Sequence, residues 1–286
     1  MALVLGLTTA FAYGTADLLA RFSTQQLGVL RALVGTLLVG SLVLTAWLLF
    51  SNVELHFLLN AWQWLVLPGV LNFAMLALLY AALERGPISV ASPLVAVHPA
   101  LVVVCLLFVG VYPSARETVG SAVILAGGLL LATQVERVGE GLSLPASYAR
   151  KTALLALACA FVLAFQILSV QHAARQIGAL PAAWGSRVFA FVCAAFALLL
   201  SRGPRRVTRR GYALTVVQGL LDVAAVTALA YGSGTDSART IVPVVGSAFS
   251  AVTVVLARLV LKEAMTRLQW LAIVVLLCGI VLLGWP

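Results

Sequence analysis

The chain has 286 residues, of which 63% are hydrophobic and 9% charged, and its formal net charge is +9. In soluble domains about a quarter of the residues are charged, so this composition argues against a water-soluble fold and predicts that the chain lies in a lipid bilayer. The basic residues stand in short loops between apolar runs, as in membrane proteins, which argues against a nucleic-acid-binding patch.

Ten apolar runs, bounded by charged residues or by Pro and Gly, are candidates to cross a bilayer as helices. They are residues 2–20, 28–49, 62–83, 88–110, 116–134, 152–174, 182–200, 212–232, 238–261 and 267–285. The longest connection, residues 136–151, separates the fifth run from the sixth. We therefore predict an all-α integral membrane protein with two five-helix units, residues 1–135 and 152–286, joined by that linker.

Polar residues inside the runs are the candidates for a solute-binding site. A charged side chain at the bilayer centre costs about 2.5–3.5 kcal/mol on insertion scales and usually faces a cavity or a partner. In the first half the candidates are Tyr13, Asn72, Tyr80 and His98. The alternatives are an interhelical hydrogen bond for Asn72 and a buried packing role for His98.

Two prolines, Pro93 and Pro99, stand close to His98 in the fourth run. A proline has no backbone N–H and leaves a carbonyl without its helix partner. In a membrane that carbonyl must face protein, water or solute. We therefore predict a bent, cavity-lining helix with Pro93 and Pro99 as kink or gating positions, and Pro243 gives the ninth run the same feature.

The candidates of the second half are Gln166, Arg187, Gln218 and Asp222. Asp222 lies near the middle of the eighth run and is the strongest of them. It either faces a cavity, where it binds a cationic group or carries a proton, or forms a buried ion pair. Arg187 has a guanidinium that matches carboxylate geometry, so it either holds a substrate carboxylate or pairs with Asp222.

Two further carboxylates have local explanations. Asp17 lies near the end of the first run, one turn before Arg21, and is expected to pair with it. Glu263 lies in the tight turn between the ninth and tenth runs. It is expected either to accept hydrogen bonds from the amides of the following helix or to act as a gate.

The sequence predicts neither a cofactor nor a metal site. Its four cysteines form no CxxC motif, which is the spacing expected of metal or redox sites. It also has no Walker motif, which argues against ATP-driven transport within this chain.

An internal repeat at an offset of 150 aligns Gly69 with Gly219 and Asn72 with Asp222. With five helices in each half, the second half must enter the membrane in the opposite orientation. Inverted repeats of this kind are common in secondary transporters, whose substrate site lies near the midplane at the repeat interface. Thirteen of the 18 Lys and Arg residues fall in odd-numbered loops, so the positive-inside rule places both termini outside.

Two segments, residues 82–104 and 238–284, resemble the EamA-type ten-helix members of the drug/metabolite transporter superfamily. Each has a proline-bearing helix, a turn and a final helix with a late glycine. The residues that carry the pattern are Pro243, Lys262, Glu263 and Gly279 in the second half, and Pro93 and Gly128 in the first, where Tyr112 stands near the place of the turn's glutamate. The resemblance implies two inverted five-helix repeats around a central cavity, and export of small metabolites as in YddG-like amino-acid exporters.

We therefore expect a secondary transporter that exports amino acids or related small metabolites across the cytoplasmic (inner) membrane by alternating access. Its expected partners are a small-molecule solute and the bilayer, with a monomeric or weakly homo-oligomeric state and with proton coupling through Asp222 or His98 left open. A membrane-embedded enzyme using His98, His172 and Asp222 is the first alternative, although no catalytic motif supports it. A lipid scramblase or structural subunit is the second, and a lateral groove would favour scrambling.

Overall fold

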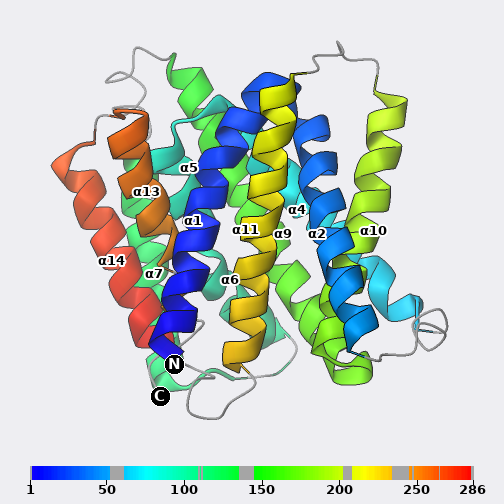
Figure 1. The fold of residues 1–286 in the computed structure, drawn as a ribbon. Coiled ribbons are helices and arrows are strands. Elements are labelled where there is room, and N and C mark those ends of the chain that lie inside the picture. The colour runs from blue at the N-terminus through cyan, green and yellow to red at the C-terminus, as the bar shows by residue number, and fades with distance from the viewer. Residues whose placement is uncertain are drawn as a thin grey trace.

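The computed structural model describes residues 2–51, 61–108, 110, 112–134, 145–201, 208–233, 245–246, 248–263 and 265–284. The helices in these ranges are α1 (Ala2–Leu27), α2 (Val29–Phe50), α4 (Gln63–Arg85), α5 (Ile88–Val95), α6 (His98–Phe108), α7 (Ala115–Thr133), α9 (Ala146–Ile177), α10 (Ala179–Leu200), α11 (Arg209–Ser233), α13 (Phe249–Val260) and α14 (Arg267–Gly284). They stand side by side in one bundle, with both termini at one end (Figure 1). We call this the terminal end, and the opposite end, where α1 meets α2 and α4 meets α5, the basic end.

Eight of the helical segments are long and apolar enough to cross a membrane, with α5 and α6 counted together as Ile88–Phe108. Two shorter apolar helices, Phe249–Val260 and Arg267–Leu283, correspond to the last two expected runs. The first part of the ninth run, with Pro243, lies outside the described residues. Many large apolar side chains on the outer surface, such as Phe11, Leu42 and Phe196, are more than half exposed, as expected of surfaces that face lipid.

Two helices are longer than the sequence predicted, because charged residues were taken as the ends of the runs. Helix α1 has 26 residues and continues past Asp17 and Arg21 to Leu27. Helix α9 has 32 residues and begins at Ala146, inside the expected linker. In its first turns the Tyr148 ring lies under the Arg85 guanidinium, 4.8 Å from the ring centroid to Cζ. Both helices exceed the roughly 20 residues that the hydrocarbon core requires, so their charged ends extend beyond it.

The first two helices of each half meet at a glycine of the same conformation. Gly28 has φ 80° and ψ 160°, and Gly178 has φ 89° and ψ 157°. Each donates its N–H to a carbonyl one turn back, Thr24 at 2.7 Å and Ala174 at 2.9 Å. Glycine suits both positions because a positive φ is costly for residues with a Cβ. The two glycines are 150 residues apart, which is the offset of the sequence repeat.

The halves also run in opposite directions. Helix α1 runs from the terminal end to the basic end, whereas α9, the first helix of the second half, runs the other way (Figure 1). The last helices of the halves, α7 and α14, pack so closely that a Cβ at Gly127 would lie 2.8 Å from the Leu276 nitrogen. A Cβ at Gly279 would lie 2.7 Å from the Ile124 nitrogen. Helices α1, α4, α9, α10 and α11 are thereby left to enclose the centre of the bundle.

Candidate functional site

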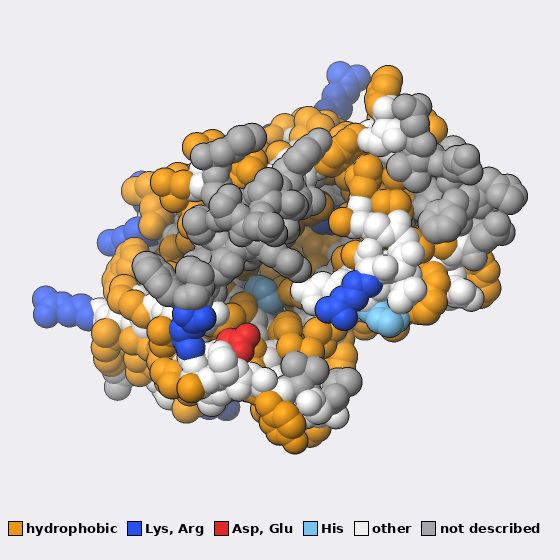
Figure 2. Space-filling view, turned by 90° about the horizontal axis from the view of Figure 1, so that it is seen from below, with side chains coloured by type: hydrophobic (Ala, Val, Ile, Leu, Met, Phe, Trp, Pro, Cys, Tyr) orange, Lys and Arg blue, Asp and Glu red, His pale blue; other side chains and the backbone are white. Residues whose placement is uncertain are grey.

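A cavity of about 520 Å³ lies among α1, α4, α9, α10 and α11, and Val95, His98, Gly246 and Phe249 complete its lining. The lining residues of α9 and α10 belong to the halves of these helices that are nearer the terminal end (Figure 1). Figure 2 looks onto this end and shows the surface hollowed near its centre. The cavity therefore extends toward the terminal end.

The structure brings together every side chain that the sequence proposed for substrate binding. All eight line this cavity: Tyr13, Asn72, Tyr80, His98, Gln166, Arg187, Gln218 and Asp222. They come from both halves of the chain and from six different helices. Their role in binding stays a prediction. Among the described residues, no group of three or more His, Cys, Asp or Glu side chains could hold a metal ion.

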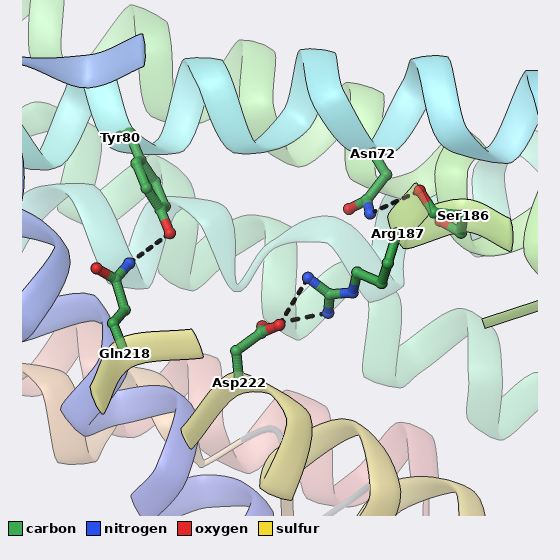
Figure 3. Close-up of polar contacts among 6 residues, drawn as sticks. All are labelled: Asn72, Tyr80, Ser186, Arg187, Gln218 and Asp222. Carbon is green, nitrogen blue, oxygen red and sulfur yellow. Dashed lines mark hydrogen bonds and ion pairs between the residues drawn. The ribbon is translucent and has the colours of Figure 1, made fainter. Parts of the chain in front are cut away.

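Arg187 and Asp222 form an ion pair across the cavity (Figure 3). Arg187 Nη1 lies 2.7 Å from Asp222 Oδ2, and Nη2 donates to Oδ1 at 3.2 Å. Helices α10 and α11, which carry the two residues, both pack against α2. Each side chain remains 12% exposed, so the pair faces the cavity. The ion pair considered for Asp222 is confirmed and Asp222 lines the cavity, while binding of a cationic group or a proton there stays a prediction.

The amide side chains on either side of this pair are engaged with neighbouring helices (Figure 3). Asn72 Nδ2 donates to the Ser186 carbonyl at 3.3 Å. Gln218 Nε2 donates to the Tyr80 hydroxyl, and Gln218 Oε1 accepts from Ser23 at 3.0 Å. Asn72 and Gln218 are both buried. Asn72 thus joins α4 to α10, as its structural alternative predicted, and Gln218 joins α11 to α4 and α1.

The fourth run is broken as its prolines predicted. Helix α5 ends at Val95 and α6 begins at His98, with a turn at Ala96 and Val97. Pro99 has no N–H to give to the Val95 carbonyl, which is its partner in a continuous helix. His98 Nδ1 donates to that carbonyl instead, at 3.1 Å. One ring nitrogen of His98 therefore supplies the hydrogen bond that the Val95 carbonyl lacks at the break, while the ring lines the cavity.

Comparison with protein families assigns the chain. The model of the EamA-like transporter family matches residues 1–133 and 150–285. The chain belongs to this family. It is therefore a multi-pass membrane protein of a transporter family within the drug/metabolite transporter superfamily.

Solved structures share the fold of this EamA-like chain. Eighteen chains match it, and one of them, described as "Crystal structure of protein", superposes with a TM-score of 0.69. That match covers 98% of this chain and 95% of the other at 19% sequence identity, so it supports the fold alone. A search of curated proteins gave no match.

One cavity residue of the EamA-like chain was missed by the sequence analysis as a candidate. Asp17 lines the cavity and is 8% exposed. The expected pairing with Arg21 is wrong. Asp17 Oδ2 accepts from Ser92 Oγ at 3.1 Å and from Thr253 Oγ1 at 3.2 Å, whereas Arg21 Nη1 donates to the Leu83 carbonyl at 3.0 Å. Asp17 follows Tyr13 by four residues, so the two share a helix face, and this spacing could have revealed it.

The basic end of the EamA-like fold is closed by a contact between the halves. Both carboxylate oxygens of buried Glu263 accept backbone N–H groups at the start of α5, from Ile88 at 3.0 Å and Ser89 at 2.9 Å. The expectation that Glu263 binds the amides of the following helix is wrong. That helix, α14, is instead capped by reciprocal hydrogen bonds between Thr266 and Gln269.

The turn that presents Glu263 has a left-handed residue. Lys262 has φ 56°, a conformation that favours glycine. Arg258 Nη1 donates to the Glu263 carbonyl at 2.9 Å and helps to hold the turn. The turn between α13 and α14 is thus shaped so that its carboxylate reaches the first half of the chain.

Proposed function

We propose that this EamA-like chain is a secondary transporter that exports amino acids or related small metabolites across the cytoplasmic membrane by alternating access. The observation that carries the proposal is the Arg187–Asp222 pair, which faces a cavity of about 520 Å³. Small-molecule sites typically enclose about 300–1,000 Å³, with a few charged or polar groups that fix orientation. The cavity has the size and the chemistry for a zwitterion.

The charges of Arg187 and Asp222 satisfy each other in the structure. An amino acid offers the complementary set, because its carboxylate fits the Arg187 fork and its ammonium fits Asp222. The solute therefore exchanges one neutral arrangement for another and leaves neither Arg187 nor Asp222 unpaired in the membrane. Tyr13, whose ring meets Phe249 edge-on with centroids 6.2 Å apart, bounds the cavity beside this pair.

The proposed cycle follows from which end is closed. The positive-inside rule favours a cytoplasmic basic end, and on that orientation we interpret the structure as an outward-facing state. Glu263 holds α5 at the closed end. The inward-open state requires that α5 and the turn between α13 and α14 separate while the terminal end closes.

Scrambling of lipids is less well supported. A lateral groove of about 470 Å³ does lie between α1 and α11, next to Phe11 and Leu221. Its polar lining is limited to the hydroxyls of Thr8 and Thr15, and none of its lining residues, all of them described, is charged. A lipid headgroup would find no polar path there.

Counterflow into proteoliposomes tests the proposal. Vesicles loaded with one unlabelled amino acid are exposed to the same labelled compound, and a panel of amino acids is compared in turn. We expect accumulation of at least one member by the wild type and a loss of about tenfold or more in Arg187→Lys, which keeps the charge but not the fork. Half-buried Glu117→Gln, outside the cavity lining, is the control. Absence of counterflow for the whole panel would overturn the proposed function.

A further inference from the structure

The charged groups of the cavity do not balance. Arg187 and Asp222 neutralise each other. Among the described residues that line the cavity, this leaves Asp17 as the one charged side chain without a partner of opposite sign. His98 is treated as neutral in this balance, and its Nδ1 donates to the Val95 carbonyl. The lining therefore carries one excess negative charge when both aspartates are ionised.

Asp17 is held by hydroxyl groups and not by a cation. Ser92 and Thr253 both donate to Oδ2, while Oδ1 accepts no hydrogen bond from any residue in the described ranges. Arg21 is committed to the Leu83 carbonyl. A carboxylate that is more than nine-tenths buried in a membrane protein is costly while ionised, unless it takes up a proton or meets a positive charge. The described residues supply no such cation, and a cationic group that enters the cavity can provide it.

We propose that Asp17 is the binding site for a positively charged amine, so that the cavity prefers solutes with one net positive charge to neutral zwitterions and anions. This inference rests on the proposed transport function and names its substrate class: primary amines and diamino acids. A net positive solute brings the total charge of the occupied cavity to zero, whereas a zwitterion leaves the excess negative charge in place.

The position of Asp17 also connects its occupant to the closed end. Ser92 belongs to α5 in the first half and Thr253 to α13 in the second, and Asp17 on α1 joins them. Helix α5 is the same helix whose N-terminus Glu263 holds. An ammonium group at Asp17 therefore lies where the two halves meet, one turn of α5 away from the contact that closes the basic end.

Equilibrium binding to the purified protein in lipid nanodiscs tests the site with three probes of one carbon skeleton. Leucine is the zwitterion, isoamylamine the cation and 4-methylpentanoate the anion. In the wild type we expect the affinity to be highest for isoamylamine, lower for leucine and lowest for 4-methylpentanoate. Asp17→Asn should weaken isoamylamine binding about 30-fold, as for the loss of one member of a buried charge pair. Asp17→Glu should retain the preference, and Glu117→Gln should bind all three probes as the wild type does.

Thermal unfolding of Asp17→Asn first establishes that the variant is folded, and Asp17→Glu keeps the test decisive if it is not. Equal isoamylamine affinity in wild type and a folded Asp17→Asn would overturn the inference, as would loss of preference in Asp17→Glu with its charge retained. The two proposals fail separately. Binding that depends on Asp17 without any counterflow would refute transport and leave the site standing, whereas counterflow of leucine with Asp17-independent amine binding would refute the site alone.

Discussion

Arg187 and Asp222 are 35 residues apart, and their contact depends on how α10 and α11 both pack against α2. The sequence identified each residue by the cost of placing a charge among apolar neighbours. The sequence could not decide between an ion pair and a cavity-facing group. No local pattern records the distance between two helices that are brought near each other by packing against a third. The structure shows that the two residues pair and that the pair lines the cavity.

The pair can be separated experimentally into its structural and its transport roles. Asp222→Asn leaves Arg187 buried without its partner and should destabilise the protein by about 3–5 kcal/mol. The double variant Arg187→Met with Asp222→Leu removes both charges and should recover most of that stability. Thermal unfolding in nanodiscs measures the stability of each variant, and counterflow measures its transport. We expect the double variant to be stable but inactive in transport. Recovery of transport in the double variant would show that neither charge meets the solute.

Asp17 marks the limit of reasoning from neighbours in sequence. Arg21 lies one turn away on the same helix and offered a sufficient local explanation. The actual partners, Ser92 and Thr253, come from helices 75 and 236 residues distant along the chain. Their hydroxyls give no sequence signal, since Ser and Thr are frequent inside membrane helices for packing reasons alone.

At the scale of elements, the break between α5 and α6 was predictable in full from Pro93 and Pro99. The hydrogen bond that replaces the missing proline N–H was not predictable, because it depends on the orientation of the His98 ring toward the Val95 carbonyl. The ends of α1 and α9 were misplaced for a different reason. Hydropathy reports where the hydrocarbon core ends, while a helix continues until a residue such as Gly28 or Gly178 stops it.

Restoring the missing N–H should stiffen this break. Pro99→Ala allows residue 99 to donate to the Val95 carbonyl in competition with His98, and it favours a continuous helix. We expect thermal stability to be equal or higher and the counterflow rate to fall about fivefold or more, since the two short helices could no longer move independently. Pro68→Ala is the matched control, because Pro68 lies inside the unbroken helix α4. An unchanged rate in Pro99→Ala would mean that the break does not move during transport.

The contact made by Glu263 allows a second test at this scale. Glu263→Ala removes the acceptor for two amides of α5 and should cost about 1–2 kcal/mol, as for other N-terminal caps. It should also favour opening of the basic end. A cysteine placed at buried Ser89, in a background without the four native cysteines, reports that opening by its reaction with maleimide.

We expect slow labelling of this cysteine with Glu263 present and labelling about tenfold faster in Glu263→Ala, given the free energy above. Glu117→Ala is the control, since Glu117 caps its own helix, α7, through Ser114. Equal labelling in all backgrounds would show that Glu263 stabilises α5 without closing the basic end.

At the scale of the molecule, hydropathy and an offset of 150 residues were enough to predict an all-helical membrane protein built in two halves. Composition requires the bilayer, and the even spread of apolar runs requires many helices. The number of full crossings was less predictable, because α13 and α14 are short and residues 238–244 lie outside the described part. The contacts between the halves were not predictable, since they join residues far apart along the chain.

The orientation of the whole molecule yields a prediction that does not depend on any single contact. Both termini lie at the terminal end (Figure 1), opposite the connections that hold Arg21, Arg85 and Lys262. By the positive-inside rule the C-terminus is outside the cytoplasm. A C-terminal alkaline phosphatase fusion expressed in bacteria should therefore be active, and a green fluorescent protein fusion at the same position dark. The opposite pair of results would reverse the proposed direction of opening.

The matched glycines at positions 28 and 178 have a mechanical consequence. The hairpin of α1 and α2 is tied at the basic end, and the hairpin of α9 and α10 is tied at the terminal end. A hairpin can splay only at its untied end. At each face of the bilayer, therefore, the helix ends of one hairpin are held together and those of the other are free to separate. The two hairpins exchange these roles when the cavity changes from opening at one face to opening at the other.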